Sequence, residues 1–281
     1  MGALWMLLAG VMFATMGVFA KFAAPTFSSA ELVFYRSLFG MLAMGGFAVW
    51  RGWPLGTSHW RLHLTRGTAG VISLGLYFYC IAHLPLATAV TLNYTSPLFL
   101  AVITAVMFRE RFGRMLLASL AVAFAGVVLL LEPTLREDQF RFGLMGLASG
   151  LLAAFAYANV KRLGATGEPS WRVVFYFTAL STAAGGLWMI VAGASPVTPA
   201  NGWMLLGLGG TATVGQFAMT RAYLTGNTLV VGTLSYSTVI FSTFFGLVLW
   251  GESLAAAAWV GIALIVAGGM ISVPASRRAG R

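Results

Sequence analysis

The feature that most constrains this chain is a succession of long apolar runs that extends over nearly all of its 281 residues. A helix needs about 20 apolar residues to cross the roughly 30 Å hydrocarbon core of a bilayer. Lipid offers no hydrogen-bond partners to the backbone, so continuous runs predict helices rather than strands. We therefore expect an all-α membrane protein with ten transmembrane helices. The expected spans are 3–23, 30–50, 66–84, 86–108, 113–131, 142–162, 172–192, 202–222, 227–250 and 254–273.

Composition excludes the other broad classes of protein. Hydrophobic residues make up 59% of the chain and charged residues only 9%, whereas a soluble domain carries about a quarter charged residues. The single cysteine, Cys80, excludes an intramolecular disulfide, and the three histidines are too scattered for a metal site. The net charge is +10, but the basic residues form no dense run of the nucleic-acid-binding type. We expect no metal, no cofactor and no nucleic-acid partner.

The distribution of positive charge predicts the orientation. If the N-terminus is cytoplasmic, most of the 17 Lys and Arg residues fall on the cytoplasmic side, while the outer loops hold Lys21, Arg136 and Arg141. This bias follows the positive-inside rule. We expect a multi-pass inner-membrane protein, either a monomer or a homodimer, with both termini and a short basic tail at 274–281 in the cytoplasm.

The two halves of the chain, 1–132 and 141–273, resemble each other. Each half holds five expected spans, and because five is odd the second half would enter the membrane in the opposite orientation. Inverted repeats of this kind are typical of secondary transporters. The matching residues are Gly10 with Gly150, Lys21 with Lys161, Tyr94 with Tyr236, Glu110 with Glu252 and Gly126 with Gly268.

The third-to-fifth-span block of each half carries a family resemblance. The first block reads CIAHLPLATAVTLNYTSPLFLAVITAVMFRERFGRMLLASLAVAFAGVVLLL, and the second reads MTRAYLTGNTLVVGTLSYSTVIFSTFFGLVLWGESLAAAAWVGIALIVAGGMI. Each has a proline or polar hinge, a Glu at the span end and a Gly-rich closing helix. In these features the chain resembles the EamA-like members of the drug/metabolite transporter superfamily. It departs from a perfect repeat at Val239, where the first half has Pro97.

The resemblance implies ten helices in two inverted five-helix repeats around a shared cavity, lined by spans one, three, four, six, eight and nine. It implies transport of small organic metabolites, with export of amino acids or related zwitterions and amines as our leading hypothesis. Uptake of a larger cofactor-like metabolite, such as a flavin or an adenosyl compound, is an alternative. A membrane scaffold or transferase without transport is a third hypothesis.

The acidic residues argue against catalysis. All seven lie at span ends or in loops, and no Ser-His-Asp set, P-loop or HExxH motif occurs. We therefore do not expect an enzyme. The lack of a carboxylate in mid-span also argues against a proton relay of the Asp/Glu type.

Pro97 lies near the centre of span four, within NYTSPLF. Proline cannot donate to the carbonyl of Asn93 and clashes with it. Asn93, Tyr94 and Ser96 add polar groups at the same depth. A broken helix of this kind predicts a hinge or a binding site, and the alternative is a structural kink satisfied by Ser96.

Other polar groups within spans are further candidates. Thr213, Gln216 and Thr220 share one helix face, and the alternative to a pocket is helix–helix hydrogen bonding. Arg36 lies six residues into span two, where it either snorkels or pairs with Glu31, or acts as a gate or carboxylate-binding residue. Glu110 and Glu252 are expected to cap helices or to pair with arginine. The expected substrate-binding residues are Thr15, Tyr77, Asn93, Tyr94, Tyr157, Gln216, Ser235 and Tyr236, with Pro97 and Arg36 as hinge or gate.

Overall fold

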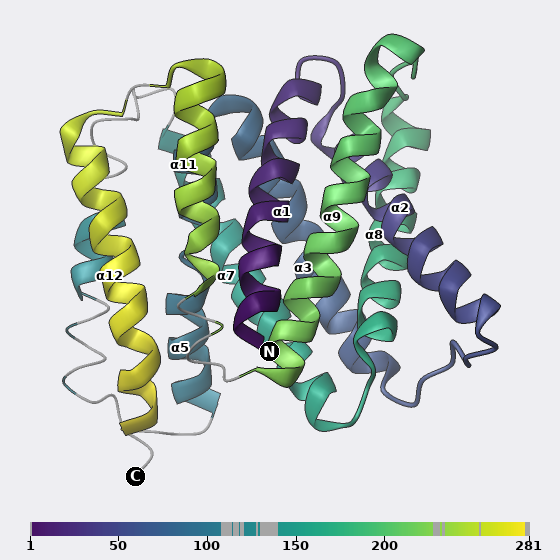
Figure 1. The fold of residues 1–281 in the computed structure, drawn as a ribbon, viewed down its shortest axis with the longest axis horizontal. Helices are drawn as coiled ribbons and strands as arrows, with labels where there is room; N and C mark the ends of the chain where they lie inside the picture. Colours follow the sequence, from purple (N-terminus) through teal and green to yellow (C-terminus); the bar gives the residue numbers. More distant parts are fainter. Residues whose placement is uncertain are drawn as a thin grey trace.

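The structure is a computed structural model of an all-α membrane protein, and no strand occurs among its described residues (Figure 1). It describes residues 2–107, 114, 118, 121–127, 129, 140–226, 231, 234–252 and 254–278. The helices are α1 (Gly2–Ala23), α2 (Ser29–Trp50), α3 (Trp60–His83), α4 (Leu86–Asn93), α5 (Ser96–Met107), α7 (Phe140–Ala165), α8 (Ser170–Ala192), α9 (Pro199–Thr225), α11 (Ser237–Trp250) and α12 (Ala256–Arg278).

The outer surface of the bundle is apolar, as lipid requires. Four of the described helices, α1, α2, α7 and α8, are long and apolar enough to cross a membrane. Large apolar side chains point outward along them, and Ile190 is 83% exposed. Water could not accommodate so much exposed apolar surface, so this surface faces the hydrocarbon of a bilayer.

The helices follow the expected spans with three differences. Span four is divided into α4 and α5, and α3 begins at Trp60, six residues before the expected span. The expected span at 113–131 lies largely outside the described residues, of which 121–127 are helical. Parts of the span expected at 227–250 also lie outside them, and α11 begins at Ser237.

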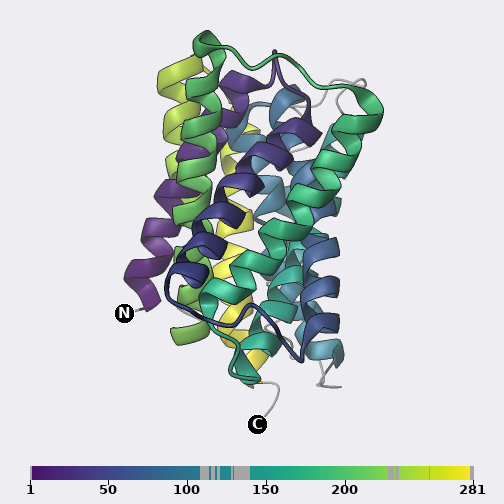
Figure 2. The same ribbon diagram turned by 90° about the vertical axis from the view of Figure 1, so that its right-hand side faces the viewer.

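Helices of the two halves interleave in the bundle. α1 packs against α9, α3 packs against α7, and α2 packs against α8. α5 and α12 contact each other and lie on the opposite side of the bundle from α2 and α8 (Figure 1). α1 begins and α12 ends toward the same end of the bundle (Figure 2). The contact of α1 with α9 thus has a counterpart in that of α3 with α7, as an exchange of similar halves would produce.

One end of the bundle is held by two carboxylates. Glu252, after α11, forms an ion pair with Lys21 at the end of α1 and accepts the Leu86 N–H at 3.0 Å, which caps α4. Glu31 closes a capping box with Ser28 at the start of α2. It also accepts the Ser195 N–H at 2.6 Å from the loop before α9. The expected cap at Glu252 is therefore present, with lysine rather than arginine as the ion-pair partner.

The opposite end is held by Glu168, in the turn between α7 and α8. Its carboxylate accepts hydrogen bonds from the Thr57 hydroxyl and from Arg172 Nη1, the latter at 3.0 Å. Burial raises the pKa of Glu168, but these hydrogen bonds and the Arg172 charge outweigh burial and hold the pKa below its ordinary value. The carboxylate therefore ties the loop after α2 to the start of α8.

Candidate functional site

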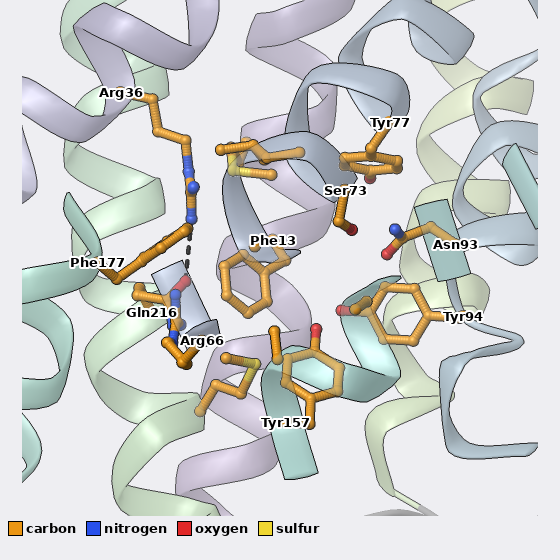
Figure 3. A pocket seen from close by; sticks show the side chains of 16 residues that line it. Phe13, Arg36, Arg66, Ser73, Tyr77, Asn93, Tyr94, Tyr157, Phe177 and Gln216 are labelled. Atoms are coloured by element: carbon orange, nitrogen blue, oxygen red, sulfur yellow. Dashed lines mark hydrogen bonds between the residues drawn. The ribbon is translucent and has the colours of Figure 1, made fainter. Parts of the chain in front are cut away.

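A cavity lies between the helices near the middle of the bundle and encloses about 560 Å³ of empty space, part of it open to the outside. Helices α1, α2, α3, α4, α7, α8 and α9 contribute to its wall. Figure 3 shows the side chains converging from these helices. Its polar lining residues are Arg36, Arg66, Ser73, Tyr77, Asn93, Tyr94, Tyr157 and Gln216.

The break between α4 and α5 brings Asn93 and Tyr94 to the cavity. The Thr95 hydroxyl donates to the Leu92 carbonyl at 2.7 Å and satisfies one of the acceptors that the break frees. Pro97 is the second residue of α5, in the first helical turn, where its missing N–H costs nothing. The break therefore lies just before Pro97, and the proline side chain itself does not line the cavity.

Helix α7 packs directly on this break because a glycine faces it. A Cβ on Gly150 would lie 2.8 Å from the Leu92 carbonyl oxygen and 3.1 Å from that of Asn93. The close approach lets the Ser149 hydroxyl accept a hydrogen bond from Asn93 Nδ2. The Ser73 hydroxyl donates to the Ser149 carbonyl at 2.8 Å. Helices α3, α4 and α7 are thereby joined by hydrogen bonds at the cavity wall.

Arg36 is buried at the cavity, where its Nη2 donates to Gln216 Oε1 at 3.1 Å. Gln216 Nε2 in turn lies 3.5 Å from the Thr220 hydroxyl, so part of the expected polar face of α9 is used inside the protein. The expected snorkelling of Arg36, or its pairing with Glu31, is wrong. Glu31 is engaged by Ser28 and Ser195, and the arginine points inward.

Arg66 is a cavity residue that sequence reasoning missed. It was expected to be one of the cytoplasmic anchoring charges, but it is only 2% exposed and lines the cavity. Its Cζ lies 3.7 Å from the centroid of the Phe177 ring on α8. Because α3 begins at Trp60, Arg66 lies in its second turn and points into the protein. The sequence signal was the arginine beside Gly67 and Gly70, which let α8 approach.

The structure brings six of the predicted residues to the cavity: Arg36, Tyr77, Asn93, Tyr94, Tyr157 and Gln216. Thr15, Pro97, Ser235 and Tyr236 are not among its lining residues. The Thr15 hydroxyl donates to the Val11 carbonyl of its own helix at 2.9 Å. Tyr236 is buried at the start of α11. Helices α2 and α8 thus replace the expected contribution of span nine to the cavity wall.

The chemistry of the cavity is cationic and aromatic. The two guanidinium groups supply positive charge and hydrogen-bond donors, and three tyrosines supply ring faces and hydroxyls. No carboxylate lines the cavity, and no group of three His, Cys, Asp or Glu side chains that could hold a metal occurs in the described part of the chain. Such a set of groups can hold an organic anion and orient it.

Comparisons with known proteins agree with this arrangement. The EamA-like transporter family profile matches residues 1–132. The pseudopaline exporter CntI of Pseudomonas aeruginosa is 31% identical over 274 residues, which cover 98% of this chain and 94% of that protein. A riboflavin transporter of Rhizobium johnstonii is 28% identical over 270 residues, covering 94% and 88% of the two chains.

A solved crystal structure shares the fold of this chain. It aligns with a TM-score of 0.72 at 20% identity and covers 99% of this chain and 98% of its own. The sequence relatives, the helical bundle and its central cavity lead to one conclusion: the chain belongs to the EamA-like transporter family of the drug/metabolite transporter superfamily, and it is a transporter rather than an enzyme.

Proposed function

We propose that the protein exports small organic metabolites that carry a carboxylate, with amino acids and related zwitterions as the leading class. The observation that carries this proposal is the buried Arg36 at the cavity. Its Nε and Nη1 have no hydrogen-bond partner among the described residues. A buried cation within a membrane protein marks a functional site by default, and a guanidinium group matches a carboxylate in charge and in geometry.

The opposite wall of the cavity suits the other end of a zwitterion. Tyr77, Tyr94 and Tyr157 offer ring faces and hydroxyl oxygens, and Asn93 offers an amide. Aromatic faces attract ammonium groups, and the apolar part of each ring accommodates a side chain. A solute held by Arg36 at its carboxylate would therefore have its ammonium group near these residues.

We propose that transport proceeds by alternating access between two inverted repeats, residues 1–132 and 141–273. The paired helix contacts support this arrangement, since α1 with α9 and α3 with α7 exchange under the repeat. The Lys21–Glu252 pair at one end of the bundle and the Glu168 contacts at the other would have to break in turn. Both halves contribute to the cavity between these ends, as alternating access requires.

We place the protein in the inner membrane with both termini in the cytoplasm. The concentration of Lys and Arg on one side supports this orientation. Outward transport is supported by the likeness to an exporter. A green fluorescent protein fused after Arg281 should fluoresce if the C-terminus is cytoplasmic, and a periplasmic alkaline phosphatase fusion at the same point should be inactive.

Flavin uptake is the second candidate function. The likeness to a riboflavin transporter favours it, and so does the aromatic lining formed by Phe13 and the tyrosines, on which a planar ring could stack. Riboflavin carries no carboxylate, so it would leave the unpaired donors of Arg36 without an anionic partner. A transport assay that includes riboflavin separates the two candidates.

Transport by purified protein in liposomes tests the proposal. We expect uptake of at least one carboxylate-bearing amino acid in exchange for the same solute inside, and we expect the rate to fall at least tenfold in Arg36→Gln. Arg51→Gln is the matched control, because Arg51 is exposed beyond the end of α2 and should leave the rate unchanged. Vesicles that remain impermeable to amino acids, amines and riboflavin alike would contradict transport and favour the scaffold hypothesis.

A further inference from the structure

The cavity holds two buried cations and no matching acid. Arg36 is 4% exposed and Arg66 is 2% exposed, and both line the same space. Neither forms an ion pair with any described residue. The three carboxylates that the structure describes are engaged elsewhere: Glu31 by Ser28 and Ser195, Glu168 by Thr57 and Arg172, and Glu252 by Lys21 and Leu86.

Both guanidinium groups have donors to spare. The Nε and Nη1 atoms of each arginine are buried without a hydrogen-bond partner among the residues described. Only the Nη2 of Arg36 has a recorded acceptor, Gln216 Oε1. Buried polar groups are almost always satisfied, and a buried charge without a partner is strongly unfavourable. Four unsatisfied donors on two cations therefore indicate that an anionic partner is missing.

The ring of Phe177 holds the two cations close together. The Cζ of Arg66 lies 3.7 Å from the ring centroid and that of Arg36 lies 5.6 Å from it. The two Cζ atoms can therefore be no further apart than these two distances combined. In Figure 3, Arg36 comes from above Phe177 and Arg66 lies below it. A single small molecule can reach both guanidinium groups.

This arrangement depends on a glycine next to the ring. A Cβ on Gly70 would lie 2.8 Å from Phe177 Cε2 and 3.1 Å from Arg66 Nη1. Any larger residue at position 70 would push the ring or the guanidinium group away. Residues from α2, α3 and α8 thus form one compact cationic site, which we call the arginine pair: Arg36, Arg66 and Phe177.

From the arginine pair we infer that the transported solute carries two carboxylates, one for each guanidinium group. This inference rests on the proposed function and narrows its substrate class from carboxylates in general to dicarboxylates. A single carboxylate would neutralise one cation and leave the other unpaired in the cavity. A dicarboxylate would neutralise both and would satisfy the free donors, while its remaining polar groups would lie toward Asn93 and the tyrosines.

Matched pairs of solutes test the inference, because each pair differs only in whether the second acid is a carboxylate or an amide. The pairs are glutamate with glutamine, aspartate with asparagine, and succinate with succinamate. We would measure thermal stabilisation of the purified protein and exchange in liposomes. For at least one pair we expect half-maximal stabilisation at a concentration at least tenfold lower for the dicarboxylate than for its amide.

Variants assign the preference to the arginine pair. Arg66→Gln should abolish the tenfold preference while leaving binding of the amide solute intact, and Arg66→Lys should restore part of it. Arg61→Gln is the matched control, since Arg61 is exposed on the same helix and should keep the full preference. Phe177→Leu provides a second variant without a change in charge, and should reduce the preference by loosening both guanidinium groups.

The outcomes separate this inference from the proposed function. If wild-type protein binds and moves the amides as well as the dicarboxylates, the inference is wrong and carboxylate transport stands. An unchanged tenfold preference in both Arg66→Gln and Phe177→Leu would also overturn the inference. If none of the solutes binds or moves, and other carboxylate-bearing amino acids fail as well, the proposed function falls together with the inference.

Discussion

Arg66 is predicted to destabilise the solute-free protein. Replacing a buried, uncompensated charge by an apolar residue of similar length removes the cost of keeping that charge out of water. Replacement of buried ionic groups by apolar residues has stabilised other proteins by about 1–4 kcal/mol. Arg66 is 2% exposed, so solvent screening leaves little of this cost out. Arg66→Met should therefore raise the free energy of unfolding.

The contact with Phe177 opposes this gain. Its cation–π attraction, with Cζ at 3.7 Å from the ring centroid, contributes about 0.5–2 kcal/mol. Methionine keeps much of the apolar packing, so little is lost from the side-chain stem. We expect a net gain of about 1–2 kcal/mol for Arg66→Met, which corresponds to a rise of roughly 2–4 °C in melting temperature for each kcal/mol.

Cys80 provides the assay. It is the one cysteine of the chain and is fully buried, so a thiol-reactive fluorogenic maleimide reports unfolding directly. Arg66→Met should melt above wild type without solute, whereas the order should reverse at saturating dicarboxylate, because bound solute stabilises wild type by about 2.7 kcal/mol at 100 times its dissociation constant. Arg61→Met should shift the midpoint by no more than about 0.5 kcal/mol. A solute-free Arg66→Met protein that melts well below wild type would refute the reasoning.

Three further predictions concern the ends of the bundle and its packing. The lowered pKa of Glu168 contributes stability above its ordinary value of 4.5, and this stability is lost as the pH falls through the lower folded-state pKa; acidification from pH 7 to 4 should therefore destabilise wild type more than Glu168→Gln, and equal losses would contradict the prediction. Gly150→Ala should cost about 1–3 kcal/mol in the maleimide assay because its Cβ would meet backbone oxygens, whereas Gly75→Ala, with open space around it, should be neutral or stabilising. Glu252→Gln should weaken the tie to Lys21 and increase labelling of a cysteine introduced at the cavity by an impermeant maleimide applied from that end; unchanged labelling would show that this end is held by other contacts.

The apolar runs of the sequence predict the helices well because hydrocarbon leaves the backbone few alternatives. Polar groups in mid-span also predict much of the cavity, since such groups avoid lipid, and Tyr77, Asn93, Tyr94 and Gln216 all line it. Periodicity along one helix does not say which neighbour its polar face meets. Ser235 and Tyr236 match the span-four cluster in the repeat but do not line the cavity in this conformation.

Arg66 shows a different limit of sequence reasoning. A charge near the end of an apolar run is typical of an anchoring residue, and six residues of extra helix before the run change that interpretation completely. Those residues, from Trp60 onward, are less apolar than the span itself, so the start of α3 was not predictable from hydropathy. The pairing of Arg66 with Arg36 depends on how α2, α3 and α8 pack, which no local pattern encodes.

The most direct test of the central claim is a structure of the purified protein with a transported dicarboxylate bound. The solute is expected in the central cavity with one carboxylate on Arg36 and the other on Arg66, beside the Phe177 ring. A solute found outside this cavity, or bound within it while both guanidinium groups remain unpaired, would contradict the account.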